Sequence, residues 1–241
     1  DFKNEALNEC PFISFLKIEI DTDFSEIKYK KYLNRYFEEL ENNKNNFFTD
    51  ISNYLSFEMG QPTHCYDASK INNQISLTKI NKNDAFRTLL GEEIKLSNEN
   101  LVFKMNNKVI NLAGVIGGSS TMCDEATSSV IIECAYFNPE NIIGKSLKYN
   151  IKSDASHKFE RGVDPASQEK ILRRFIKIVS DHVKIKSLEM ISFDSGKFRN
   201  NEVTNDYKKV NKILGSNVTF ESYKNILSNL FFIINENIIV P

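Results

Sequence analysis

A carboxylate inside an apolar run is the residue of this sequence best placed to do chemistry. Residues 130–135 read VIIECA, which puts Glu133 among strand-forming apolar neighbours. Burying a carboxylate is costly unless a partner or a task offsets the cost, so Glu133 is a candidate for a binding or catalytic site. The alternative is a solvent-facing Glu133 on an edge strand, with Ile131 on the same face and Ile132 and Cys134 on the other. The residues alone leave both interpretations open.

A second candidate is His64, which follows a turn at residues 60–62 (Gly-Gln-Pro) that cannot continue a helix. A loop histidine with a pKa near neutrality suits activation of water or recognition of a polar group. It can equally well hydrogen-bond to its own loop. Ser52 and Asn53 are candidate ligands for a hydroxyl or carbonyl group, or else a turn or N-cap pair.

Three further features carry weaker signals. The turn Gly114–Gly118 allows close backbone approach to a ligand, or is a simple hairpin bend; it lacks the spacing of a phosphate-binding loop. His157, Lys158 and Arg161 form a basic cluster that could meet RNA phosphates or be ordinary surface. The four cysteines are scattered without metal-ligand spacing, so we expect no metal site and four separate thiols in a reducing compartment.

Composition narrows the class of protein. The 241 residues carry 31 Lys and Arg against 32 Asp and Glu, a net charge of −1, which argues against a polycationic nucleic-acid binder. The apolar fraction of 41% is ample for a core. No apolar run approaches the roughly 18 residues of a membrane span, so we expect a soluble, cytoplasmic protein with no membrane partner.

The elements that must position these residues predict an α+β fold. Alternation predicts a strand at the end of residues 11–20, and short alternating runs from Ile71 to Val115 predict an antiparallel sheet or barrel-like core. Residues 130–135 and 188–193 read as further strands. Helical spacing marks 27–40, with Ser25 as a plausible N-cap, and also 139–147 and 165–183.

The last part of the chain has a different pattern of predicted elements. Residues 206–214 and 220–230 read as two helices around a glycine turn, and 231–240 as a hairpin. We therefore expect one domain over residues 1–200 and the beginning of a small helical, winged-helix-like unit over 201–241.

Four motifs in order carry a resemblance to a known family. They are GQPTHCYD at 60–67, LAGVIGG at 112–118, IECAYFNP at 132–139 and SDASHKFERGVDP at 153–165. Together they resemble the editing module of the beta subunit of bacterial-type phenylalanine–tRNA ligases, from about Cys10 to Gly196. Tyr66 stands where that family usually has Phe, Cys65 where it usually has Ala, and Ser153 where it usually has Thr.

The resemblance implies proofreading: hydrolysis of tyrosyl-tRNA that was charged onto the phenylalanine tRNA. It implies that Glu133 reads the tyrosine para-hydroxyl and that His64 and Asn53 lie near the scissile ester and its water. The remaining substrate-binding residues that it implies are Ser52, Gly117, Gly118, Ser153 and Ala155.

The resemblance also implies partners and limits. The partners are the phenylalanine tRNA and the alpha subunit, in a heterotetramer of two alpha and two beta subunits. No cofactor is expected in this chain, and ATP and magnesium are implied only for the full enzyme. One alternative stays open: a scaffold that contacts tRNA but has lost editing. A freestanding sugar- or nucleotide-binding domain has only the glycine turn in its favour, and we set it aside.

Overall fold

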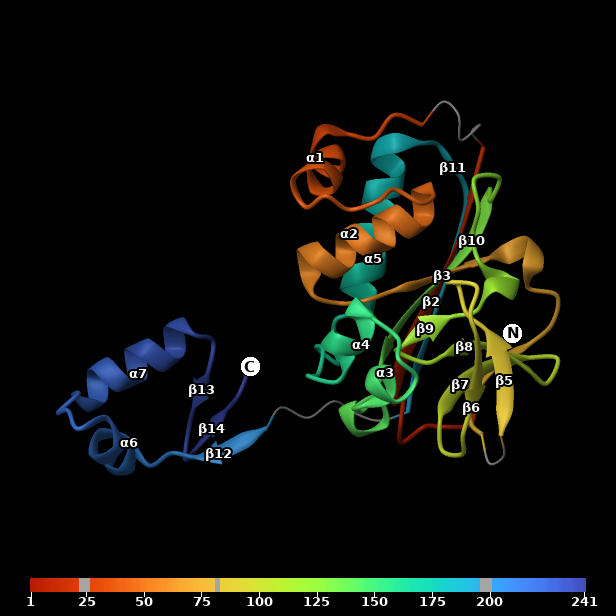
Figure 1. The fold of residues 1–241 in the computed structure, drawn as a ribbon. Coiled ribbons are helices and arrows are strands. Elements are labelled where there is room, and N and C mark those ends of the chain that lie inside the picture. Colours follow the sequence, from red (N-terminus) through yellow and green to blue (C-terminus); the bar gives the residue numbers. More distant parts are fainter. Residues whose placement is uncertain (22–26, 81–82, 196–200) are drawn as a thin grey trace. The chain divides into compact units, whose positions relative to one another are not determined.

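The computed structural model describes residues 1–21, 27–80, 83–195 and 201–241, so the predicted N-cap Ser25 lies outside the described residues. The chain divides into two compact units, Asp1–Gly196 and Lys197–Pro241 (Figure 1). This division lies close to the predicted boundary at residue 200. No helix in the described residues is both long enough and apolar enough to cross a membrane.

A four-stranded antiparallel sheet lies at the centre of the first unit. Its strand order is β11 (Ile185–Asp194), β2 (Phe12–Ile20), β10 (Ser129–Tyr136) and β3 (His64–Asp67). Strand β10 pairs with β2 on one side and with β3 on the other. The edge-strand alternative for Glu133 is therefore wrong, because its strand is a central one.

The second sheet comes from the region where short alternating runs predict antiparallel pairing. Its five strands follow the order β1 (Phe2–Asn4), β4 (Ile75–Lys79), β7 (Leu101–Met105), β8 (Lys108–Leu112) and β9 (Ile116–Gly117). Among the described strands of this sheet, β1 and β4 pair in parallel and the other neighbours pair antiparallel. A separate hairpin pairs β5 (Asp84–Arg87) with β6 (Glu93–Leu96). The α+β class is confirmed, but the barrel-like closure is not: the described strands form open sheets.

Three helices cover one face of the four-stranded sheet (Figure 1): α1 (Lys31–Glu39), α2 (Phe47–Met59) and α5 (Gln168–His182). Helices α1 and α5 confirm the helices predicted within 27–40 and 165–183. Helix α2 was not predicted, because seven of its thirteen residues are buried and no polar face marks its period. It begins at the N-cap Asn46, whose side chain accepts from the Thr49 N–H, and ends at Gly60 with φ +73°.

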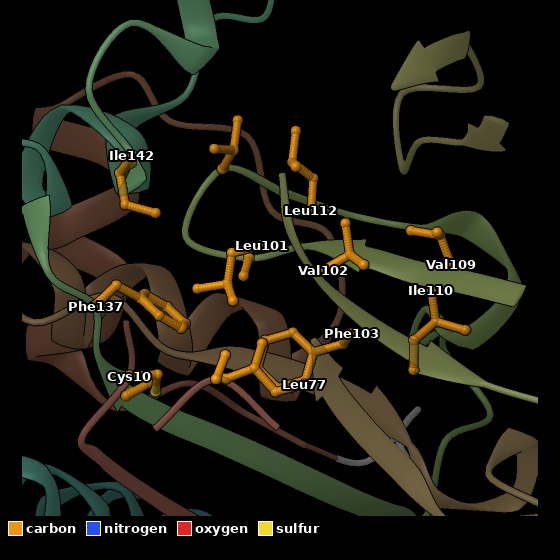
Figure 2. Close-up of a cluster of buried hydrophobic side chains, with 14 of the residues drawn as sticks. Cys10, Leu77, Leu101, Val102, Phe103, Val109, Ile110, Leu112, Phe137 and Ile142 are labelled. Carbon is orange, nitrogen blue, oxygen red and sulfur yellow. The ribbon is translucent and has the colours of Figure 1, made fainter. Parts of the chain in front are cut away.

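The period of two along β10 separates two apolar clusters. Val130, Ile132 and Cys134 belong to a cluster with the helices, whereas Ala135 belongs to a cluster with the five-stranded sheet. Figure 2 shows part of the second cluster, with Leu77 and Phe103 among its side chains. Glu133, in phase with Ala135, thus faces the region between the two sheets.

The segment between β10 and α5 is less helical than predicted. A 3-10 turn at Pro139–Asn141 is separated from α3 (Lys145–Lys148) by Gly144, whose φ of +74° interrupts the helix predicted over 139–147. Helix α4 (Asp154–Phe159) then begins at Ser153, whose hydroxyl accepts from the Ser156 N–H.

The second unit contains both helices and strands. Helices α6 (Tyr207–Leu214) and α7 (Phe220–Asn229) and the hairpin of β13 (Ile233–Ile234) and β14 (Asn237–Ile239) match the predicted elements. Strand β12 (Glu202–Thr204) was not predicted, and it completes the sheet order β12-β14-β13. The buried hydrophobic side chains of the unit are Tyr223 and Ile238.

Candidate functional site

A pocket of about 390 Å³ opens in the first unit where α2, β3, β10, α4 and the turn before β9 come together. This volume lies within the usual range for small-ligand sites. Residues far apart in the sequence meet on its wall; those named by the sequence analysis are Ser52, Asn53, His64, Gly114, Gly117, Glu133 and Ala155. The roles assigned to them stay predictions.

His64 and Glu133 are direct neighbours across the β3–β10 ladder. Paired residues of antiparallel strands project from the same face of a sheet with their Cβ atoms about 4.5–5.5 Å apart. Glu133 is 4% exposed, and the Nε2 atom of His64 is buried with no hydrogen-bond partner among the described residues. The two side chains are thus an acid and an imidazole side by side at the edge of a cavity.

Two linked hydrogen bonds connect Glu133 to Tyr66 and Asn111. The Tyr66 hydroxyl donates to Oε2 of Glu133 at 2.9 Å, and the Asn111 side-chain amide donates to the Tyr66 oxygen at 2.9 Å. Tyr66 is two residues beyond His64 on β3, and its ring meets the His64 imidazole edge-on at 4.5 Å between centroids. These two hydrogen bonds therefore hold one carboxyl oxygen of Glu133 in place.

Burial shifts both titrating groups of the pair toward their neutral forms. It raises the pKa of Glu133 to about 8, although the bond from Tyr66 lowers it, and it lowers the pKa of His64 to about 4. Near pH 7 the site therefore offers a neutral imidazole with a free lone pair and a mostly protonated acid. Such an imidazole can orient a water molecule or accept its proton.

Helix α2 brings two adjacent polar residues to the pocket. Ser52 is buried, and its hydroxyl is bonded to Thr63, with 2.8 Å to the carbonyl oxygen and 2.7 Å to the hydroxyl. Asn53 is exposed. Ser52 thus links α2 to the start of β3, while the exposed Asn53 amide lines the pocket.

The glycine turn is shaped by contact with the pocket residues. A Cβ at Gly117 would lie 2.2 Å from Cε1 and 2.7 Å from Nε2 of His64. Gly114 has φ +68°, and a Cβ there would lie 2.8 Å from Ile142. Gly117 is therefore needed for the imidazole to occupy its present position, and Gly114 for the turn itself.

Two predicted substrate-binding residues do not line the pocket. A Cβ at Gly118 would point to the backbone oxygen of Ile110, 2.6 Å away, because Gly118 packs against β8. The Ser153 hydroxyl donates to the Val115 carbonyl oxygen at 2.6 Å and caps α4. These two residues support the walls of the pocket, whereas Ala155, two residues after the cap, lines it.

Sequence reasoning missed several lining residues, among them Thr63, Leu89, Leu90 and Asn111. Asn111 follows two apolar residues in β8 and is only 4% exposed, so a buried amide within an apolar strand was the available signal. Leu89 and Leu90 are exposed apolar side chains after β5, which the sequence alone does not distinguish from ordinary surface.

The weaker signals do not converge on a second site. In the basic cluster, Lys158 pairs with Asp154 and Arg161 with Glu160, which offsets much of its charge. No three His, Cys, Asp or Glu side chains gather as metal ligands within the described part of the chain. All four cysteines are buried and unpaired thiols.

Comparison with known proteins identifies the family. The model of the B3/4 domain matches residues 22–184, about two thirds of the chain. The chain therefore belongs to the B3/4 domain family.

Among curated proteins it is similar to phenylalanine–tRNA ligase beta subunits. The subunit of Legionella pneumophila (strain Lens) is 35% identical over 187 residues, which are 77% of this chain and 24% of that protein. The subunit of Pectobacterium atrosepticum is 31% identical over 183 residues, 75% of this chain and 23% of that protein. The chain thus spans about a quarter of the length of these relatives. The resemblance predicted from the four motifs is confirmed.

A solved structure is also similar: an N-terminal fragment of the phenylalanyl-tRNA synthetase beta subunit from Pyrococcus horikoshii. The match covers 100% of this chain and 68% of that one, with a TM-score of 0.45 and 10% identity. Family membership rests on the sequence matches.

Proposed function

We propose that this chain is the editing module of a phenylalanine–tRNA ligase beta subunit and hydrolyses tyrosyl-tRNA mischarged on the phenylalanine tRNA. The observation that carries the proposal is the pairing of His64 with Glu133 on neighbouring strands, both lining one pocket, in a chain of the B3/4 family. In this arrangement the acid recognises the substrate and the neighbouring imidazole serves its hydrolysis.

Glu133 selects the substrate in this proposal. An apolar synthetic pocket rejects an added hydroxyl only weakly, so tyrosine enters in place of phenylalanine. In the present pocket Tyr66 bonds to Oε2 of Glu133, and no described residue bonds to Oε1. A tyrosine hydroxyl can pair with that second oxygen, whereas a phenylalanine ring would leave it buried and unpaired, at a cost in binding.

His64 serves the hydrolysis. The attacking water adds its oxygen to the ester carbonyl carbon, the bond to the ribose oxygen breaks, and the proton lost by water ends on that ribose oxygen. The buried Nε2 of His64 has no hydrogen-bond partner among the described residues, so it can accept a hydrogen bond from the attacking water. In this proposal the exposed Asn53 of the pocket wall holds the carbonyl or the ribose.

The remaining activities belong to other parts of the enzyme. In this proposal the chain works in the cytoplasm with the phenylalanine tRNA and the alpha subunit, in an assembly of two alpha and two beta subunits. Aminoacylation, with its ATP and magnesium, takes place outside this chain. This division agrees with the quarter of the relatives' length that the chain spans.

Replacing Glu133 tests the proposal. In the assembled enzyme, Glu133→Ala should slow hydrolysis of tyrosyl-tRNA by about 5- to 150-fold, because loss of the carboxyl group leaves the substrate hydroxyl buried and unpaired, which costs about 1–3 kcal/mol. Aminoacylation with phenylalanine should be unchanged. His64→Ala should slow turnover with less change in the preference for tyrosine, because its proposed place is at the ester.

Glu93→Ala is a matched control, since Glu93 is an exposed carboxylate on β6 outside the pocket. Both aminoacylation and deacylation by this variant should equal those of the wild type. If Glu133→Ala also clears tyrosyl-tRNA normally, the module is a scaffold that contacts tRNA without editing it.

A further inference from the structure

Tyr66 contacts His64 and Glu133 of the pocket wall without lining the pocket itself. It is fully buried, and its hydroxyl reaches Glu133 while its ring packs against His64. Asn111 and Glu133, its two hydrogen-bond partners, both lie on the pocket wall, but Tyr66 does not. The phenol therefore lies behind the carboxyl group and not between it and the cavity.

The direction of the hydrogen bonds around Tyr66 follows from the donors available. A phenol has one proton and an oxygen that can also accept. The Asn111 amide donates to that oxygen, so the single phenol proton is directed to Oε2 of Glu133. These two hydrogen bonds fix the rotation of the Glu133 carboxyl group. Its other oxygen, Oε1, accepts no hydrogen bond from the described residues.

From this geometry we infer that Tyr66 is a specificity-determining positioning residue, which with Asn111 holds Oε2 of Glu133 so that Oε1 meets the hydroxyl of a tyrosyl substrate. The inference rests on the proposed editing function and adds a residue to it. Tyr66 touches no substrate in this arrangement; it acts only through Glu133. Tyr66 belongs to the paired strand β3, two residues after His64.

The test is Tyr66→Phe in the assembled enzyme, which removes one oxygen and keeps the ring that packs against His64. The readout is the ratio of kcat/KM for tyrosyl-tRNA to that for phenylalanyl-tRNA in deacylation. We expect this ratio to fall about two- to tenfold, the range of a typical single hydrogen bond. A partial loss of folded protein lowers both values equally and leaves the ratio unchanged.

Tyr149→Phe is the matched control. Its hydroxyl is also hydrogen-bonded inside the first unit, to Ser97 and Asn100, but Tyr149 lies outside the pocket. The ratio should keep its wild-type value in this variant. A double variant of Tyr66→Phe with Glu133→Ala should show the same ratio as Glu133→Ala alone, because Tyr66 has then lost the group through which it acts.

Two results would overturn the inference while leaving the proposed function intact. An unchanged ratio in Tyr66→Phe, with a lowered ratio in Glu133→Ala, makes Tyr66 a packing residue only. A raised ratio means that the phenol competes with the substrate for Glu133. If Glu133→Ala itself leaves the ratio unchanged, the proposed function fails first and the inference falls with it.

Discussion

Two regions of the first unit each bury a carboxylate against a tyrosine, but they complete its hydrogen bonds differently. Asp50, in the first turn of α2, accepts from the Tyr29 hydroxyl at 2.7 Å on Oδ2 and from the Asn45 N–H at 2.9 Å on Oδ1. Glu133, at the pocket, accepts from Tyr66 on Oε2, and no other residue that the structure describes bonds to its carboxyl group. One carboxylate has both oxygens bonded by the protein, and the other has one.

The difference separates a structural acid from an acid that can bind a ligand. Burial raises the pKa of both groups, but bonds to Asn45 and Tyr29, with the nearby charge of Lys44, oppose the shift at Asp50. At Glu133 only the bond from Tyr66 opposes it, and the pKa reaches about 8. A buried polar group that the fold leaves partly unpaired, beside a cavity, is where an incoming hydroxyl gains most.

The largest effect should come from filling the pocket while leaving Asp50 alone. Ala155 lines the cavity from α4, and Ala155→Trp should abolish hydrolysis of both tyrosyl- and phenylalanyl-tRNA. Deacylation assays with the assembled enzyme measure this. Ala126→Trp, at an exposed position outside the pocket, is the control and should be fully active. Normal deacylation by Ala155→Trp would show that hydrolysis occurs elsewhere.

The next effect should fall on stability and not on specificity. Asp50→Ala leaves the Tyr29 hydroxyl and the Asn45 N–H without their acceptor, so the free energy of unfolding should drop by about 1–3 kcal/mol. The preference for tyrosyl-tRNA among molecules that remain folded should not change. Denaturant titration together with the deacylation ratio tests both parts.

Tyr29→Phe, which removes only one donor, should cost less than Asp50→Ala. If Asp50→Ala instead changes the deacylation ratio, the contrast between a structural and a ligand-binding carboxylate is wrong.

Local patterns explain which parts of this fold could be predicted from the sequence. Residues 130–135 form a short apolar run of the kind that predicts a buried strand, and the helix within 165–183 has a clear period of 3.6; both are present, as β10 and α5. Helix α2 has no such period, because the sheet, α1 and α5 bury most of its surface. Its presence depends on tertiary packing, which a single sequence does not display.

The same limit applies to the site. His64 and Glu133 stand out by residue type, but their pairing depends on the β3–β10 register, which joins segments almost 70 residues apart. Tyr66 looks like an ordinary strand aromatic until the fold places its hydroxyl on Glu133. Gly118 and Ser153 share motifs with lining residues yet support the walls, since neighbours in sequence point in different directions.

The last effect is on the pH dependence of the free energy of unfolding, which should distinguish Glu133 from Asp50. Glu133 has a folded pKa of about 8 against an ordinary value of 4.5, so the folded protein keeps a proton that the unfolded chain releases between these values. Stability therefore falls as pH rises through that window. His64 acts oppositely: with a folded pKa of about 4 against 6.5, it costs stability as pH falls below 6.5.

Between pH 6.5 and 8, Glu133 is therefore the member of the pair that titrates differently in the folded and unfolded states. The free energy of unfolding should decline there with a slope of at most about 1.4 kcal/mol per pH unit for one proton. Glu133→Gln should remove that decline, whereas Asp50→Asn should keep it while lowering the whole curve. Denaturant titrations at several pH values measure the slopes. A decline that persists in Glu133→Gln would assign the proton to another group and place Glu133 with Asp50 among the structural acids.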